Sequence, residues 1–451
     1  MLRRRHGRRA AALPRAAGGR RAELQHRQRA LGGDDLRSRS AGEAAHKCRG
    51  RDRLPAAPLR GRRAKDPERR EGARGARIRG EGRPRRRPGA DDRVVSRAKP
   101  GVNLIRLAWP DVGAAEAEAV AEVLESGQLT MGPKVEEFER GLAAACGTEY
   151  AVVVSSGTAA LHLAVLALGI GPGDEVLVPA YTFPATANVV AFVGAKPVLV
   201  DVDPETMNLD PQKLEPGPKT KAIVAVDLFG RPARIEQLPD GVPVLEDAAG
   251  ALGAKRQGRP CGSLGALACL SFHPRKIVTT GEGGAVTTDD AELADAIRRM
   301  RHHGIEPRGS FEIAHAGLNC RLSDILCAVG IPQLARLGEL LEARTRIAAG
   351  YTERLRDIVE TPSADEGDVH GWQAYVIQVD GAAAKIAALR EQGIEAQVGT
   401  YALHRLAAYQ DQGEFPGASK VFDRAIALPF HTRLTSNDLD RVAEAVTELA
   451  D

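Results

Sequence analysis

Short apolar runs alternate with helical runs through the middle of the chain, and this alternation is the feature that most constrains the fold. Strands are predicted at 151–154, 175–178 and 197–200, with helices at 158–168 and 184–193 between them. Consecutive strands that are joined by helices lie parallel in one sheet, because the helix carries the chain back to the edge where the strand began. The sequence therefore predicts an α/β fold, with a mainly parallel sheet covered by helices on both faces.

Further strands and helices are predicted on both sides of this region. Further strands are predicted at 222–226, 243–246, 266–272 and 285–288, and further helices at 114–125, 134–145 and 291–301. A helical stretch at 323–355, interrupted near Pro332, is long enough to bridge two domains. Beyond it the pattern changes to a strand at 372–379, a helix at 382–392, a strand at 394–398 and a helix at 439–449. We therefore predict a large domain over 101–335 and a smaller α+β domain over 336–451.

The first hundred residues differ sharply from the rest in composition. They hold 32 Lys and Arg against 11 Asp and Glu, a net charge of +21, whereas residues 101–451 carry a net charge of −17. Because all aromatic residues lie beyond residue 100, the basic segment cannot build a core and is predicted to be disordered. It is either a nucleic-acid-binding arm, which the lack of aromatic residues disfavours, or translated sequence upstream of the true start.

The composition of the remaining chain argues against several classes of protein. No apolar run is long enough to cross a membrane, and no apolar segment near the start resembles a secretory signal. The six cysteines show no CxxC spacing, so we interpret them as the reduced thiols of a cytoplasmic protein. The histidines are scattered, and no metal site is predicted.

Lys276 follows the predicted strand 266–272 and precedes the glycine-rich turn 281–284. A lysine at the end of a buried strand loses its proton readily, because desolvation lowers its pKa and leaves the amine free to act as a nucleophile. This suggests Schiff-base chemistry. Taken alone, however, such a lysine is more often a solvated residue beside a turn.

Two other strand ends strengthen the chemical interpretation. Strand 151–154 runs through Ser155-Ser156-Gly157-Thr158 into a helix, where free backbone N–H groups and hydroxyls suit a phosphate. Strand 243–246 ends at Asp247, and Phe183 follows strand 175–178. Ligands of open α/β sheets bind beyond the carboxyl ends of the strands. A phosphate cradle, an acid, an aromatic ring and a lysine in one crevice are what pyridoxal phosphate (PLP) requires.

In the order in which these motifs occur, the chain closely resembles the DegT-type sugar-nucleotide aminotransferases. The resemblance runs from about Ile105 to Glu448 and includes Ser126 to Pro133, Ser155 to Leu161, Glu246 to Ala249, Ser271 to Lys276 and Gly281 to Gly284. It implies the three-layer PLP-dependent transferase fold type I, with a mainly parallel sheet and a smaller C-terminal α+β domain. It also implies a homodimer with shared active sites.

The resemblance assigns a role to each candidate residue of the site. It implies that Lys276 binds the cofactor and moves protons, that Asp247 pairs with the pyridine nitrogen, that Gly157, Thr158 and Ser271 bind the phosphate, that Phe183 stacks on the ring, and that Asn319 reaches the phosphate of the neighbouring subunit. Two positions depart from the family pattern. Gly250 replaces a glutamine that contacts the phenolic oxygen of the cofactor, and Asp227 replaces a histidine.

The function implied by the resemblance is transfer of an amino group, from an amino acid such as glutamate, to a keto sugar carried on a nucleotide. The Gly281-Glu282-Gly283-Gly284 form of the loop resembles the branch that acts at C4 of 4-keto-6-deoxy sugars. Two alternatives stay open. A sugar dehydratase of the same fold would carry histidine in place of Lys276, so the lysine argues against it. A regulatory protein that keeps the fold without turnover is favoured by Gly250.

Overall fold

The structure is a computed structural model that describes residues 103–305, 313 and 315–450. The chain divides into two units, Met1–Arg87 and Pro88–Asp451, and the first lies wholly outside the described residues. The predictions made for residues 1–100 also lie outside them. No helix within the described ranges is both long enough and apolar enough to cross a membrane.

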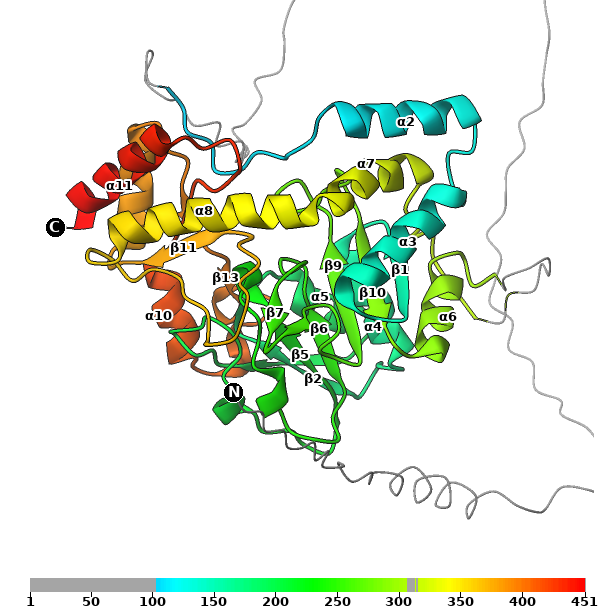
Figure 1. Ribbon diagram of the computed structural model, residues 1–451. Coiled ribbons are helices and arrows are strands. Elements are labelled where there is room, and N and C mark those ends of the chain that lie inside the picture. The colour runs from blue at the N-terminus through cyan, green and yellow to red at the C-terminus, as the bar shows by residue number, and fades with distance from the viewer. Residues whose placement is uncertain (1–102, 306–312, 314, 451) are drawn as a thin grey trace, which may run out of the picture. The chain divides into compact units, whose positions relative to one another are not determined.

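A seven-stranded sheet forms the centre of the described part of the chain (Figure 1). Its strand order is β1-β10-β9-β6-β5-β2-β4. The strands are β1 (Tyr150–Val154), β2 (Glu175–Pro179), β4 (Lys196–Val200), β5 (Thr220–Val226), β6 (Val244–Asp247), β9 (Leu267–Ser271) and β10 (Gly284–Thr288). The pairs from β4 through β9 are parallel, and only β10 runs antiparallel to its neighbours β9 and β1. The predicted mainly parallel sheet is confirmed.

Helices cover both faces of this sheet, and strand β1 shows why. Successive side chains of a strand point to opposite faces, so Val152 and Val154 enter one hydrophobic core while Ala151 and Val153 enter another. The first core takes in α4 (Gly157–Ala167), α5 (Ala185–Phe192) and α6 (Ala291–Met300). The second takes in α3 (Pro133–Cys146) and α7 (Asp324–Ala335), against which α2 (Ala114–Ser126) packs. This is the predicted three-layer arrangement.

A smaller antiparallel sheet, of order β11-β14-β12, lies in the C-terminal part of the chain. It consists of β11 (Tyr375–Gln378), β12 (Gln397–Val398) and β14 (Ala425–Leu428). Helices α8 (Leu337–Leu355), α9 (Ala382–Glu391) and α11 (Ser436–Ala450) bury a separate core against it, around Tyr351 and Tyr375. Helix α10 (Pro416–Arg424) packs instead on the core of the large sheet. A two-stranded pair, β3 (Tyr181–Thr182) with β13 (Tyr401–Ala402), joins the two parts. The division at residue 335 stays a prediction.

The interruption predicted near Pro332 is wrong. Pro332 lies inside α7, and the helical stretch breaks at Arg336 between α7 and α8, which run end to end in Figure 1. The side-chain amide of Gln333 donates 2.7 Å to the Val329 carbonyl, which satisfies an acceptor close to the proline. Arg336 donates to Asp111 at 3.0 Å, so the break is held by an ion pair that no local pattern indicates.

The second predicted strand of the small domain is also shorter than expected. Only Gln397–Val398 pairs as β12, whereas Ile394 forms an isolated parallel bridge with Ile105. Strand β14 and helix α10 were not predicted. The run Ala425–Leu428 is four residues long and directly follows α10, so it carries no recognisable period of its own.

Candidate active site

The predicted site residues lie where the strands of the large sheet end. Ser271 ends β9, Asp247 ends the neighbouring strand β6, and Ser155 follows β1. Asp247 lies opposite Cys269 in the parallel β6–β9 pair, two residues before Ser271. Because parallel strands share one carboxyl edge, these side chains meet at the same edge of the sheet.

Asp247 is a buried acid at this edge that two hydrogen bonds hold in place. It is 5% exposed, its Oδ2 accepts a 2.9 Å hydrogen bond from Thr186, and its Oδ1 accepts one of 3.3 Å from the Ala249 backbone. Burial raises the pKa of Asp247, while the hydrogen bond from Thr186 and the positive charge of Lys276 oppose that increase. The carboxylate is thus oriented by Thr186 of α5, a residue that the sequence did not single out.

Lys276 lies in the turn after β9, within the electrostatic reach of Asp247. Its backbone N–H donates 2.8 Å to the His273 carbonyl, which closes the turn, and the side chain is half-buried. Desolvation lowers the pKa of Lys276, Arg275 lowers it further, and Asp247 opposes them. A lysine in this setting is more readily neutral, and therefore nucleophilic, than an exposed one.

The start of α4 forms a narrow cradle beside Ser271. Ser156 caps the helix, since its hydroxyl accepts 3.0 Å from the Ala159 backbone, and Gly157 and Thr158 open the first turn. A Cβ added to Gly157 would lie 2.8 Å from Ser271 Cβ, so only glycine lets the helix start approach Ser271. Backbone N–H groups beside a hydroxyl, at a helix N-terminus, fit a phosphate.

Phe183 and Asn319 lie more openly than the other candidates. The Phe183 side chain is 61% exposed and meets the ring of Tyr401 edge-on at 6.1 Å between centroids. Asn319 is exposed, and its segment is held to the end of β1 by a 2.8 Å hydrogen bond from Ser155 N–H to the Cys320 carbonyl. Stacking by Phe183 and phosphate binding by Asn319 stay predictions.

The structure thus brings four predicted features together: Lys276 with its lowered pKa, the buried Asp247, the Gly157 cradle and the Ser271 hydroxyl. Their donor set fits PLP. The cradle suits the phosphate, the carboxylate suits a protonated ring nitrogen, and the amine suits the aldehyde.

The chain matches the model of the DegT/DnrJ/EryC1/StrS aminotransferase family over residues 110–447. The chain belongs to this family. It is 38% identical to the spore coat polysaccharide biosynthesis protein SpsC of Bacillus subtilis, over 75% of this chain and 95% of that protein. It is 37% identical to the GDP-perosamine synthase of Caulobacter vibrioides, over 76% of this chain and 98% of that protein.

Solved structures of the family agree with this assignment. A Streptococcus pneumoniae protein described as a sugar aminotransferase, and solved in a PLP form, superposes with a TM-score of 0.73 at 30% identity. The superposition covers 77% of this chain and 99% of the other. The DegT-family chain therefore has the fold of the fold type I PLP-dependent aminotransferases, as predicted.

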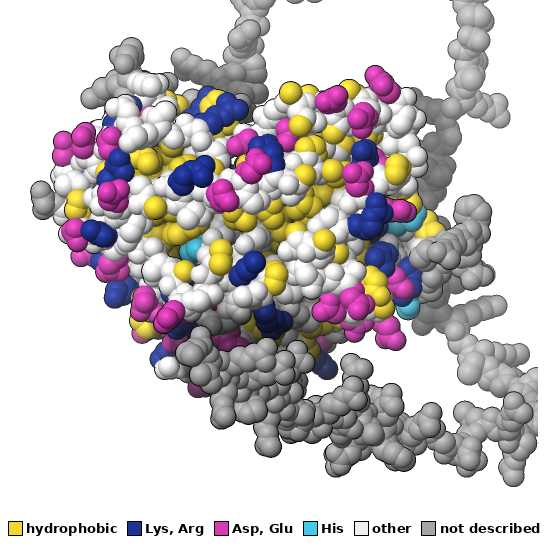
Figure 2. Space-filling view, in the orientation of Figure 1, with side chains coloured by type: hydrophobic (Ala, Val, Ile, Leu, Met, Phe, Trp, Pro, Cys, Tyr) yellow, Lys and Arg dark blue, Asp and Glu magenta, His cyan; other side chains and the backbone are white. Residues whose placement is uncertain are grey.

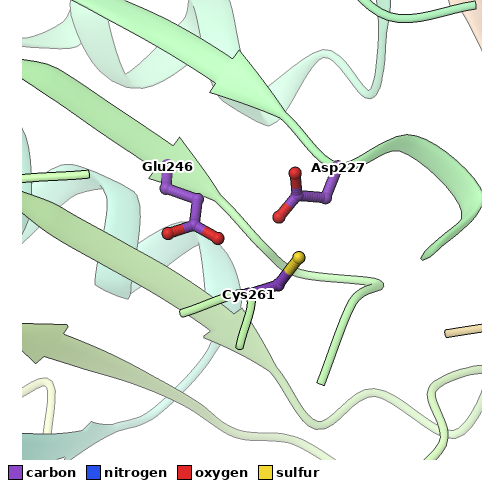
Figure 3. Close-up of side chains that lie close together, drawn as sticks. All are labelled: Asp227, Glu246 and Cys261. Atoms are coloured by element: carbon purple, nitrogen blue, oxygen red, sulfur yellow. The ribbon is translucent and has the colours of Figure 1, made fainter. Parts of the chain in front are cut away.

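At one departure from the DegT-family pattern, the structure shows a buried acidic pair. Figure 3 shows that the side chains of Asp227 and Glu246 point toward one another, with Cys261 beside them. Three backbone N–H groups, those of Gly262, Leu264 and Gly265, donate to Glu246. Among the described residues, Asp227 Oδ2 has no hydrogen-bond partner when both acids are ionised.

A proton on Asp227 resolves this arrangement. Burial, the charge of Glu246 and the hydrogen bond to Glu246 together raise the pKa of Asp227 well above its usual value. The protonated Asp227 then donates to Glu246. Burial raises the pKa of Glu246, and the hydrogen bonds from Asp227 and from the three backbone donors oppose that increase. Because Asp227 N–H also donates 3.1 Å to the Asp247 carbonyl, the pair holds the strand end that carries Asp247.

This pair predicts how stability depends on pH. Unfolded aspartate titrates near pH 4, and the folded pKa of Asp227 is higher, so the stability that the pair contributes is lost as pH rises through the folded pKa. Asp227→Asn keeps an N–H donor for Glu246 and has no proton to lose. We expect the melting temperature of Asp227→Asn to increase relative to that of wild type as the pH is raised from about 5 to about 8.

The exposed substitution Asp295→Asn on α6 makes the same chemical change away from the pair and serves as the control. A constant difference in melting temperature between Asp227→Asn and wild type, at every pH in that range, would show that no proton is shared.

Proposed function

We propose that this protein is a PLP-dependent aminotransferase that transfers an amino group from an amino acid, glutamate in the first instance, to a keto sugar carried on a nucleotide. The observation that carries the proposal is the electrostatic interaction of Lys276 with Asp247 at the carboxyl edge of the sheet, next to the Gly157 cradle. The similarity to a GDP-perosamine synthase supports a sugar nucleotide as acceptor. We place the reaction in amino-sugar or polysaccharide biosynthesis in the cytoplasm.

Each site residue has a task in this reaction. When bound, PLP supplies an electron sink for the carbon that carries the amino group of the donor. Asp247 holds a proton on the pyridine nitrogen, because a carboxylate stabilises the positive charge there. Lys276, with its lowered pKa, would move the proton between the donor α-carbon and C4′ of the cofactor, the carbon of its aldehyde group. Gly157, Thr158 and Ser271 hold the phosphate, and Phe183 covers one face of the ring.

The finer substrate proposal is a 4-keto-6-deoxy sugar, based on the Gly281 to Gly284 loop. Gly281 has a φ of +83°, and a Cβ at Gly283 would lie 2.4 Å from Thr280 Oγ1, so the loop accepts no larger side chains without moving. This geometry supports a loop of defined shape. The choice of sugar rests on the resemblance of the loop sequence.

We further propose a homodimer in which Asn319 of one protomer reaches the phosphate site of its partner. Several large hydrophobic side chains are exposed at the end of α2 and on the segment that joins it to α3, as a dimer interface would require: Leu124 at 56%, Leu129 at 43% and Met131 at 54%. Figure 2 shows hydrophobic side chains gathered across the middle of the face that is in view. Arg321 is less suited to a partner, since it donates 2.6 Å to His302 of its own chain.

Spectral titration tests both halves of the reaction. We expect glutamate to convert the absorbance of the bound cofactor to that of its amino form. We expect one member of a panel of nucleotide-linked 3-keto, 4-keto and 4-keto-6-deoxy sugars to restore it. No conversion with any amino donor would favour the regulatory alternative. Conversion that only a 3-keto sugar reverses would refute the proposed position on the sugar.

A further inference from the structure

The space beside Gly250 is filled by the side chain of Gln373. A Cβ added to Gly250 would lie 3.4 Å from each of Gln373 Cβ, Cγ and Oε1. The φ of Gly250 is not positive, so its backbone does not itself require glycine. A single methyl group would fit at ordinary contact distance, but a longer side chain would need the volume that Gln373 occupies.

The same amide reaches the turn that carries Lys276. Gln373 Nε2 donates 3.3 Å to the carbonyl of Arg275, the residue before Lys276. One side chain therefore touches two loops of the site: the loop that leaves β6 after Asp247 and the loop that leaves β9 toward Lys276. These two loops are joined here by a residue about a hundred positions further along the chain.

The backbone around Gln373 is fixed by several contacts. Its N–H donates 3.0 Å to the Phe229 carbonyl, and Arg344 donates 2.9 Å to the carbonyl of Trp372. Both Phe229, at φ +58°, and Trp372, at φ +49°, adopt left-handed conformations that are costly for such residues. A Cβ at Gly230 would lie 2.8 Å from Trp372 N, so the two segments approach as closely as glycine allows. These contacts and the strained backbone conformations fix the position of Gln373.

We infer that Gln373 is a positioning residue of this site, and that it supplies from the C-terminal part of the chain the amide that position 250 lacks. It braces the Lys276 turn through the Arg275 carbonyl and presents its amide at the place where a side chain of residue 250 would lie. This inference rests on the proposed function, in which PLP binds at Lys276. It also removes the reason for which Gly250 favoured a protein without turnover.

An exchange of the two side chains tests the inference. We expect Gln373→Ala to weaken PLP binding about tenfold, and to shift the pH midpoint of the absorbance of the bound cofactor by about one unit, because one hydrogen bond beside Lys276 is lost. Gly250→Gln alone is expected to bind PLP as weakly as Gln373→Ala does, since two side chains then compete for one space. The double variant Gly250→Gln/Gln373→Ala is expected to bind PLP with an affinity within about threefold of that of wild type. The effects of the two substitutions would then be strongly non-additive, because one compensates for the other.

Two further variants separate positioning from stability. Gln373→Glu keeps the shape of the side chain but cannot donate to the Arg275 carbonyl when ionised. It is therefore expected to bind PLP as weakly as Gln373→Ala does. Gln378, on β11 of the same segment, donates 3.0 Å to the Pro204 carbonyl away from the site. Gln378→Ala should lower the melting temperature and leave both cofactor measurements unchanged.

The inference is overturned if Gln373→Ala binds PLP with wild-type affinity and an unchanged midpoint. It is also overturned if the loss of PLP affinity in the double variant equals the losses in the two single variants combined. Failure of the proposed function looks different, since wild type itself would then take up no PLP at Lys276. If Gln373→Ala does not fold, Gln373→Glu and the double variant make the same test.

Discussion

Replacing Lys276 by alanine is expected to reduce both half-reactions by more than about 10³-fold while leaving the protein folded. The residue is proposed both to bind the cofactor and to move the proton, and loss of a general base alone costs about 10²–10⁴-fold. The substitution also removes the positive charge that lowers the pKa of Asp247, so the neutral form of that acid becomes more favourable. Single-turnover absorbance changes with glutamate, together with a melting curve, make the measurement.

Covalent labelling identifies the lysine directly. Borohydride reduction of the protein loaded with PLP is expected to fix the cofactor on the peptide that carries Lys276, and to fix none on the Lys276→Ala variant. Lys196 is the matched control, because its side chain is 65% exposed and pairs with Glu175 at 3.2 Å. We expect Lys196→Ala to label and turn over as wild type does. A label found on Lys196 or Lys255 in the wild-type protein would refute the assignment of Lys276.

Mixing two inactive variants is expected to restore about a quarter of wild-type activity. One variant is Lys276→Ala and the other is Asn319→Asp, which places a negative charge against the phosphate of the partner. If each site is built from two chains, a mixed dimer has one site with both defects and one site with none. Random pairing makes about half of the dimers mixed, and each of these has one good site of two.

Subunit exchange must be verified for this result to count, and native mass spectrometry shows whether mixed dimers have formed. Asn103 is exposed at the first described residue and is far in sequence from every candidate of the site, so Asn103→Asp controls for the added charge. Activity that stays near zero in confirmed mixed dimers means that the phosphate site lies within one chain. Asn319 would then be only a residue of the turn beside β1.

Much of the fold follows from signals that lie within a few residues of one another. Periodicity predicts the strands of the seven-stranded sheet and the helices from α2 to α6 to within about two residues, because each buries one face or two against its neighbours. Glycine ends α2 and α3 at Gly127 and Gly147, with φ values of 71° and 69°, as helix caps require. Where periodicity was weak, as in β14, or competed with a proline, as at Pro332, the prediction failed.

By itself, the sequence determined which residues stand at the strand ends, and hence the candidates Lys276, Asp247, Gly157 and Ser271. Motif order and the shared carboxyl edge of parallel strands suffice for that, since both are local or topological. Only the tertiary structure decided which groups orient them. Thr186 reaches Asp247 across 61 positions, and Gln373 reaches Arg275 across 98. Such contacts leave no periodic trace in the sequence, because a hydrogen bond between distant segments depends on how the elements pack and not on the spacing of residues within either one.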